Sequence, residues 1–301
     1  MEPFTDKVED AEEALSVIRD GSVVAVSGFN LATAPEYLIE KLYGLYRRTG
    51  HPKRLFLMSD AFPGSPGRGL DFVAKQLYEE GDREFIEAIL MPYLGWSVWL
   101  QRMVADELVE AYTWSIGVMA YWFREVGSGR PGLVTKVGLH TFFDPRHDGG
   151  FLNERARKSR RATAEVINVG GEEYLLYRAP KPEVALIRGS TADEIGNLTM
   201  EDEAMYGSVL SIAQAVKALP KKGTVIAQVE RIARYGSLNP KEVVVPGPLI
   251  DHVVVAPPDK HWQVSSIQYD PMIAGRILPP PRLAEPLPLD LRKAIARRVL
   301  L

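Results

Sequence analysis

The chain has 301 residues, of which 46% are hydrophobic and 25% are charged, and it contains no cysteine. The missing cysteines exclude disulfides, thiolate metal ligands and a cysteine nucleophile. A formal net charge of −3 argues against a nucleic-acid-binding surface, and no apolar run reaches the roughly 20 residues that a membrane span needs. The N-terminal residues are acidic rather than basic and apolar, so we expect a cytoplasmic protein.

The first elements predict a strand that ends in a glycine turn. A short amphipathic helix over residues 11–19 leads into Val23 to Val26, a β-branched run typical of a parallel strand covered on both faces. Gly28 then ends the strand, because it tolerates positive φ angles and lets a ligand approach the backbone. An ordinary strand-to-helix turn is the alternative interpretation.

A second helix is predicted directly after this turn. Thr33 and Glu36 have the spacing of a capping box with Pro35 in the first turn, so the helix should run to about Arg47. Its free N–H groups should face the turn. Ligands bind at the carboxyl ends of strands in open α/β sheets, and helix N-termini there favour phosphate or carboxylate groups.

The next hundred residues predict a strand, a loop and an aromatic-rich pair of helices. Arg54 to Met58 reads as a strand, and residues 62–70, with three glycines and two prolines, predict a long surface loop. Residues 84–123 carry two helical patterns and most of the large aromatic side chains. Spread over many turns, these aromatics are predicted to be core rather than a stacking platform.

The remaining elements alternate between strand and helix. Strands are predicted over 133–137, 163–169, 172–177, 183–188 and 223–229, and the strands over 242–245 and 251–255 should complete the sheet. A polar turn is predicted over 191–197, and helices over 208–218 and 289–300. The strands over 163–169 and 172–177 should form a hairpin at Gly170-Gly171. Residues 257–288 mix proline with apolar residues and predict an extended arm.

This alternation predicts an α/β fold with a largely parallel open sheet flanked by helices, a local antiparallel hairpin and an extended C-terminal arm. We expect a domain over residues 1–257, followed over 258–301 by a Pro-rich arm and terminal helix that contact a partner.

Four groups of short motifs occur in order along almost the whole chain. They are Asp20-Gly21, Val24-Ala25-Val26, Gly28-Phe29 and Pro35; Gly69-Leu70-Asp71, Gly138-Leu139, Thr141-Phe142, Asp144-Pro145-Arg146, Gly149-Gly150 and Asn153; 183–189, Thr191 to Glu194, Gly196-Asn197 and Thr199-Met200-Glu201; and Val245-Pro246-Gly247, Asp251 and His261-Trp262-Gln263. Together they resemble the α subunit, equivalently the amino-terminal half, of family I coenzyme A transferases, especially the branch that acts on acetate and propionate.

The resemblance implies a ping-pong reaction between acyl-CoA and carboxylates. An active-site glutamate attacks the thioester and carries CoA as a glutamyl thioester, which is nucleophilic catalysis. That glutamate belongs to the β half of the family. Residues 291–298 resemble the linker helix before the β half, so Glu194, Glu201 and Glu203 inherit no such role. We expect no catalytic residue on this chain, a β-type partner subunit that carries the glutamate, a CoA thioester as substrate, and no permanently bound cofactor.

Three departures from the family pattern fall at pocket positions. Leu31 and Thr33 replace two loop glycines, His140 replaces a glycine, and Ser115-Ile116-Gly117 replaces a Pro-Gln-Gly stretch whose glutamine is associated with the oxyanion pocket. Isoleucine cannot donate a hydrogen bond to an oxyanion, and losing one such donor costs about 2.7 to 4 kcal/mol of barrier. The CoA- and substrate-binding residues implied by the resemblance are Ser27, Gly28, Phe29, Asn30, Ile116, Gly117, His140, Gly196 and Asn197.

Other constellations favour structural interpretations. His140 and His147 flank Asp144, but a solvated loop is favoured over a metal site, and His261-Trp262 is expected to anchor the arm. Two alternative functions remain open. One is an acyl-CoA hydrolase or ring-opening enzyme on the same scaffold, and the other is a non-catalytic subunit that binds CoA or a partner.

Overall fold

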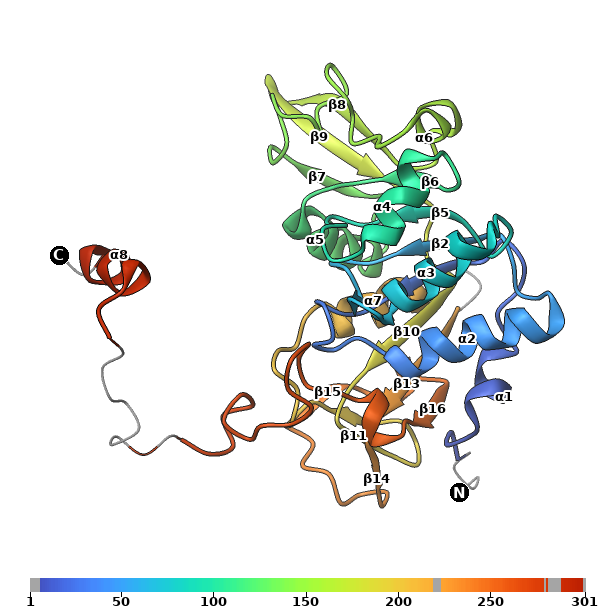
Figure 1. Ribbon diagram of the computed structural model, residues 1–301, viewed down its shortest axis with the longest axis vertical. Helices are drawn as coiled ribbons and strands as arrows, with labels where there is room; N and C mark the ends of the chain where they lie inside the picture. Colours follow the sequence, from blue (N-terminus) through green and yellow to red (C-terminus); the bar gives the residue numbers. More distant parts are fainter. Residues whose placement is uncertain (1–5, 219–222, 279, 281–287, 300–301) are drawn as a thin grey trace.

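A computed structural model describes residues 6–218, 223–278, 280 and 288–299. Its centre is a parallel sheet in the order β16-β13-β10-β1-β2-β5-β6 (Figure 1), so the predicted α/β fold with a large parallel sheet is confirmed. The strands are β1 (Val23–Val26), β2 (Leu55–Met58), β5 (Ile86–Leu90), β6 (Glu110–Tyr112), β10 (Val184–Arg188), β13 (Thr224–Val229) and β16 (His252–Val255).

Helices cover both faces of this sheet, which is why its strands are apolar on both sides. Val24 and Val26 of β1 pack into one core cluster, whereas Ala25 packs into the other. The first cluster lies under α1 (Ala11–Leu15), α2 (Glu36–Thr49), α3 (Leu70–Glu80) and α4 (Val98–Ala105), and the second under α5 (Ile116–Gly127) and α7 (Val209–Lys217). No helix among the described residues has the length and apolar character needed to cross a membrane.

A three-stranded antiparallel sheet extends the molecule beyond β6, at the top of Figure 1. It consists of β7 (Leu133–Thr135), β9 (Glu172–Arg178) and β8 (Thr163–Val169), with α6 (Glu154–Ser159) beside it. The predicted hairpin is confirmed, since β8 and β9 pair from Thr163 opposite Arg178 to Val169 opposite Glu172.

A four-stranded sheet corrects two predictions. It comprises β14 (Arg231–Ala233), β11 (Thr191–Asp193), β12 (Leu198–Thr199) and β15 (Val243–Val245). The segment predicted as a polar turn therefore contains a strand, and the strand over 242–245 does not complete the main sheet. Both errors have one cause, because the parallel pairing of β10 with β13 continues directly into that of β11 with β14. This continuation brings Ala192 and Leu198 into the same core cluster as Ala185 of the main sheet.

The prediction of a long surface loop over residues 62–70 is also wrong. It forms a short hairpin of β3 (Gly64–Ser65) and β4 (Arg68–Gly69), and Phe62 beneath it is almost fully buried. The region over 84–123 contains β5 and β6 besides its two helices. Its aromatic residues divide: Tyr112, Trp114 and Trp122 are core, whereas Tyr93, Trp96 and Tyr121 are exposed.

The C-terminal arm begins against the body and ends away from it. After η1 (Gly247–Leu249) and β16, the chain turns through η2 (Pro258–Lys260), and the side chains of His261 and Gln263 are buried. The last helix, α8 (Leu291–Val299), has no buried side chain and stands apart from the body in Figure 1. Residues 279, 281–287 and 300–301 of the predicted arm and helix lie outside the described residues.

Candidate functional site

The strand order reverses between β1 and β10, which places a topological switch point at the centre of the sheet. From β1 the chain proceeds outward to β2, β5 and β6, and from β10 it proceeds in the opposite direction to β13 and β16. Ligand sites of open α/β sheets lie outside the carboxyl ends of the strands at such a point. The residues that follow β1 and β10 therefore define the candidate site.

The loop after β1, residues 27–35, has an unusual backbone that explains its glycine. Gly28 has a φ of 134°, and a Cβ atom there would lie 2.8 Å from the Cα of Ala34. Gly28 is thus required because the loop folds closely onto itself. Asn30 and Thr33 also have positive φ angles, of 54° and 55°, which non-glycine residues adopt only when their surroundings impose them. Phe29 at the loop tip is 45% exposed.

The N-terminus of α2 is capped by a side chain from another strand, which corrects the predicted capping box. Thr33 forms no cap, and its buried Oγ1 has no hydrogen-bond partner. Instead, Oε1 of the fully buried Gln228 accepts hydrogen bonds from the N–H groups of Tyr37 at 3.0 Å and Leu38 at 3.3 Å. These two donors, predicted to face a ligand, are already occupied.

Arg188 fills the switch point itself. Its guanidinium, at the end of β10, is 2% exposed and donates from Nη1 to the carbonyl oxygens of Leu31 at 3.0 Å and Ala34 at 3.3 Å. Its Nε donates to Oε1 of Glu203 at 2.9 Å. Burial favours the neutral acid, but the Arg188 charge and a hydrogen bond from His261 lower the pKa of Glu203 to about 2. The pair is therefore an ion pair at neutral pH.

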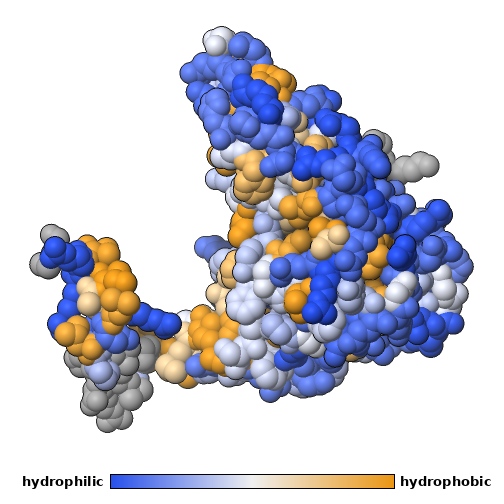
Figure 2. Space-filling model, turned by 45° about the horizontal axis from the view of Figure 1, so that its top comes forward, coloured by the Kyte–Doolittle hydropathy of each residue, from blue (hydrophilic) through white to orange (hydrophobic). Residues whose placement is uncertain are grey.

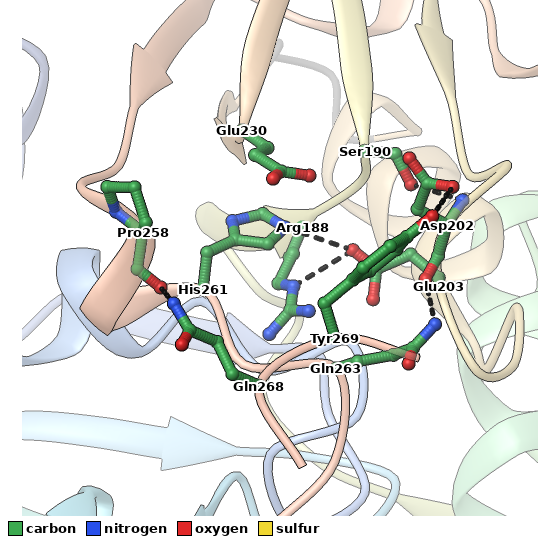
Figure 3. Close-up of a pocket in the computed structure, with 10 residues that line it drawn as sticks. All are labelled: Arg188, Ser190, Asp202, Glu203, Glu230, Pro258, His261, Gln263, Gln268 and Tyr269. Carbon is green, nitrogen blue, oxygen red and sulfur yellow. Dashed lines mark hydrogen bonds and ion pairs between the residues drawn. The ribbon is translucent and has the colours of Figure 1, made fainter. Parts of the chain in front are cut away.

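His261 connects the arm to this ion pair. Burial and the nearby Arg188 charge lower its pKa, so the ring is neutral at neutral pH. Its Nε2 lies 3.3 Å from Oε1 of Glu203, and its Nδ1 lies 3.3 Å from Nε2 of Gln228. Because a carboxylate only accepts and an amide nitrogen only donates, the proton of the neutral ring is on Nε2. Figure 3 shows Arg188 and His261 converging on Glu203.

A cavity of about 60 Å³ lies beside these residues. It is polar, and Tyr269 and Gln268 of the arm border it (Figure 3). The second oxygen of Glu203, Oε2, is buried there without a hydrogen-bond partner. The volume suits one or two water molecules rather than an organic substrate.

A second arginine fastens the arm to α2. Arg68, from the β3–β4 hairpin, forms a bidentate ion pair with the buried Glu36 at 2.8 and 2.7 Å. Its guanidinium carbon also lies 4.2 Å from the ring centroid of Trp262, and its Nη2 donates to the carbonyl of Asp259. The expectation that His261-Trp262 anchors the arm is thereby confirmed.

The other expected pocket residues on the β6 side of the sheet are accessible. Ser115 caps α5 by accepting a hydrogen bond from the N–H of Val118. Ile116, the first residue of α5, is 45% exposed, and Gly117 beside it is also exposed. His140 is exposed on the loop whose Gly150 accepts a hydrogen bond from Thr113, directly after β6. These positions thus follow the carboxyl end of β6.

Gly196 and Asn197 lie at the opposite end of the sheet. The Asn197 side chain accepts a hydrogen bond from the N–H of Gly247 and donates to Asp193. Gly247 precedes Asp251, whose carboxylate accepts from the N–H of Val225 at the start of β13. The structure therefore does not bring Gly196-Asn197 together with residues 27–30.

The described residues contain no group of three or more His, Asp or Glu side chains placed to hold a metal ion. Asp144, between His140 and His147, is instead held by Arg146 through two hydrogen bonds, and these lower the pKa of its carboxyl group well below the ordinary range. The ion pair of Asp144 with Arg146 supports the interpretation of His140, Asp144 and His147 as parts of a loop rather than as a metal site.

Sequence reasoning missed Arg188 and Gln228 as site residues. Arg188 is the last residue of β10 (Val184–Arg188) and Gln228 the next to last of β13 (Thr224–Val229), and both strands are otherwise mostly apolar. A charged or amide side chain that ends a buried strand points to a buried polar network, because such a group needs partners. That signal was available in the sequence.

Comparison with known proteins assigns the family. The family profile described as coenzyme A transferase matches residues 8–256. The chain belongs to the coenzyme A transferase family. A caffeate CoA-transferase of Acetobacterium woodii is 37% identical over 97% of this chain and 54% of its own length. The acetate CoA-transferase YdiF of Escherichia coli (strain K12) is 32% identical over 97% of this chain and 53% of its own length.

Solved structures support the same fold. The apoenzyme of acyl-CoA transferase YdiF from Escherichia coli O157:H7 superposes with a TM-score of 0.83 at 31% identity, covering 98% of this chain and 54% of that chain. The chain therefore spans about half the length of these single-chain relatives. A shorter relative, one of the subunits of a succinyl-CoA:3-ketoacid coenzyme A transferase of Helicobacter pylori (strain J99 / ATCC 700824), is 26% identical over 82% of this chain and 90% of its own length.

Proposed function

We propose that this CoA-transferase family chain is the α-type half of an acyl-CoA:carboxylate CoA-transferase, and that a β-type partner subunit carries the catalytic glutamate. The observation that carries the proposal is the family match over residues 8–256, in a chain of which 97% aligns with 54% of a single-chain relative. In this proposal the residues up to 257 form the catalytic half-domain, and the arm over 258–301 contacts the partner.

The carboxylates near the switch point are engaged in buried ion pairs, which supports a nucleophile that comes from the partner subunit. Glu203 is buried in its ion pair with Arg188, and Glu36 is buried against Arg68. A glutamate that attacks a thioester must reach the substrate with a free carboxylate. Neither residue meets that requirement, so both are structural in this proposal.

The reaction follows from this division of labour. The partner's glutamate attacks the acyl-CoA carbonyl and expels CoA thiolate, which leaves a mixed anhydride of the acyl group and the glutamate. The thiolate then attacks the glutamyl carbonyl, so the acyl group departs as its carboxylate with one glutamate oxygen and CoA stays as a glutamyl thioester. A second carboxylate then receives the CoA. This chain contributes the switch-point loop at Ser27, Gly28, Phe29 and Asn30, and the surface at Ile116, Gly117 and His140. We assign Gly196 and Asn197 no contact with the reacting groups.

The test is an assay of the purified full chain, alone and with its β-type partner. Acetyl-CoA or propionyl-CoA is mixed with a second carboxylate, and CoA species are separated by liquid chromatography and mass spectrometry. We expect a new CoA ester only when both chains are present, and a CoA adduct on the partner's glutamate. Turnover by this chain alone, with no β chain detectable by mass spectrometry, would contradict the proposed division.

The same assay separates the alternative functions. Release of free CoA without a new ester indicates a hydrolase, and conversion of the acyl group with CoA retained indicates a ring-opening enzyme. No reaction in the assembled complex, over a wide range of acyl-CoA substrates, indicates a non-catalytic subunit. Each of these three results would overturn the transferase proposal.

A further inference from the structure

We propose that Arg188 is a positioning residue that holds the loop over residues 28–34 in its strained shape. The proposal rests on the proposed function only where it says what the loop binds. Arg188 does not touch the expected position of substrate, since its side chain is buried beneath the loop. Arg188 would therefore affect substrate binding only indirectly, through its hydrogen bonds to the loop backbone.

The geometry of the guanidinium carries the proposal. One arginine joins three segments that are remote in sequence: Nη1 reaches the loop carbonyls of Leu31 and Ala34, and Nε reaches Glu203. The planar guanidinium can donate hydrogen bonds to the loop carbonyls and to Glu203 at the same time, whereas the compact ammonium group of lysine cannot span these separate acceptors. The Glu203 oxygen that accepts from Nε of Arg188 also lies 3.3 Å from Nε2 of His261 (Figure 3), so both side chains fix the carboxylate that orients the guanidinium.

The loop needs such a constraint because its backbone is unfavourable by itself. Gly28, Asn30 and Thr33 all have positive φ within six residues, and two of them carry side chains. Backbone of this kind persists only where surrounding contacts over-determine it. Within the loop, Phe29 and Ala32 bond each other and the N–H of Ala34 donates to the carbonyl of Leu31 at 3.3 Å. Two further bonds hold it from outside: the Ser27 hydroxyl donates to the carbonyl of Thr33 at 2.7 Å, and Asn30 donates to the carbonyl of Phe62. Arg188 is the charged side chain that adds to these, at the carbonyls of Leu31 and Ala34.

Arg188→Lys is the test variant. It keeps the positive charge beside Glu203 but cannot serve the loop carbonyls at the same time. Hydrogen–deuterium exchange of the full chain, read by mass spectrometry, should show amides of residues 28–34 exchanging at least about tenfold faster, with sheet amides unchanged. The matched control is Arg161→Lys, because Arg161 is likewise an ion-paired arginine, bonded to Glu87 and Glu110, but lies near β6. The control should leave loop exchange unchanged.

Glu203→Gln separates positioning from general stability. Glutamine still accepts from Nε of Arg188, and both bonds to the loop carbonyls remain, so loop exchange should stay within about twofold of the wild-type rate even if the urea midpoint falls. Equal acceleration in both variants, or acceleration of all amides in Arg188→Lys, would overturn the proposal. So would unchanged loop exchange in Arg188→Lys.

Steady-state kinetics of the complex with the β-type chain supply a second measurement. A change in KM for acyl-CoA alone is not expected if Arg188 only stabilises the fold. If the loop binds acyl-CoA, Arg188→Lys should raise KM for acyl-CoA about tenfold with kcat changed less than about twofold. Faster loop exchange with unchanged KM would support the positioning role and count instead against the loop as the acyl-CoA site. The two ideas therefore fail separately.

Discussion

At the scale of single residues, buried polar side chains occupy positions that a ligand would use in a simpler α/β protein. Gln228 takes the N–H groups at the start of α2, and Arg188 fills the space at the switch point. Neither group can be removed without leaving a buried partner unsatisfied, which is the costly event in such networks. The accessible positions are instead Phe29 and Ile116.

Ile116 gives the sharpest prediction at this scale. If it stands at the family's oxyanion position, Ile116→Gln in the complex should raise kcat for acetyl-CoA or propionyl-CoA, because the amide adds a donor where negative charge develops. A well-placed donor contributes about 100- to 1,000-fold. Because Ile116 is exposed, stability should change by no more than about 0.5 kcal/mol. Steady-state kinetics provide the measurement.

The control for Ile116 is on the same helix. Tyr121 is exposed on α5, away from the helix start, so Tyr121→Gln makes a similar surface change without reaching the proposed pocket. Lower activity of Ile116→Gln toward every acyl-CoA tested, in an intact complex, would show that Ile116 does not occupy the oxyanion position.

Asp60, after β2, predicts a pH dependence of stability. Burial raises its pKa above 3.8, although hydrogen bonds from Ser208 and Ala61 oppose the shift. A carboxyl group whose native pKa is raised contributes stability below its unfolded pKa, and loses it as pH rises through the native pKa. Asp60→Asn should therefore stabilise the protein near neutral pH, because an asparagine accepts the same hydrogen bonds without charge.

Urea unfolding at a series of pH values tests this expectation. The gain in the free energy of unfolding from Asp60→Asn should shrink as pH falls through the raised native pKa, and vanish below 3.8. A gain that stays constant over this range, or a loss near neutral pH, would show that the Asp60 charge is not the destabilising feature.

At the scale of elements, the loop between β1 and α2 depends on close backbone packing. Residues 28–34 fold back so that Gly28 meets Ala34, and α2 then begins after Pro35 without a side-chain cap of its own. The start of α2 is therefore coupled to β13 through Gln228, and to the arm through Arg68 and Glu36. The N-terminus of α2 therefore depends on contacts with β13 and the arm, and would not form in the same way in an isolated helix.

Two glycine substitutions in this unit should have opposite signs. Gly28→Ala places a Cβ 2.8 Å from Ala34 at a positive φ, so it should lower the free energy of unfolding by about 1–3 kcal/mol. Gly44→Ala, inside α2 with no neighbour within 4 Å, should raise it by about 0.5–1 kcal/mol. Chemical denaturation measures both, and equal effects would contradict the close-packing account.

At the scale of the whole molecule, the arm leads from the packed body to helix α8, whose apolar face is exposed. Leu291, Ile295 and Val299 are spaced four residues apart on α8, and all are exposed. Figure 2 shows this apolar stripe on the helix that stands apart from the body. Exposed stripes of this kind mark interaction surfaces, which fits a role of the arm in partner binding.

Deletion of residues 283–301 should weaken binding of the β-type partner. The body keeps its core because α8 contributes no buried side chain, so the far-ultraviolet circular dichroism should change only by the loss of α8. Gel filtration of the mixed chains measures assembly. A double substitution of Leu291→Asp and Ile295→Asp should act in the same direction, whereas Arg297→Asp on the opposite face should act less. Unaltered assembly in the deletion variant would count against the arm as the interface.

The sequence by itself determined the parallel sheet, the hairpin and the family, because each depends on local information. Val23 to Val26 and Val184 to Ile187 are continuous apolar runs typical of a strand covered on both faces, and Gly170-Gly171 sets a two-residue turn. The tertiary structure alone decided what surrounds the switch point. Gln228 caps α2 from 191 residues away, and Arg188 holds a loop 157 residues distant. Such contacts depend on how strands are ordered in the sheet, and local propensity carries no record of that order.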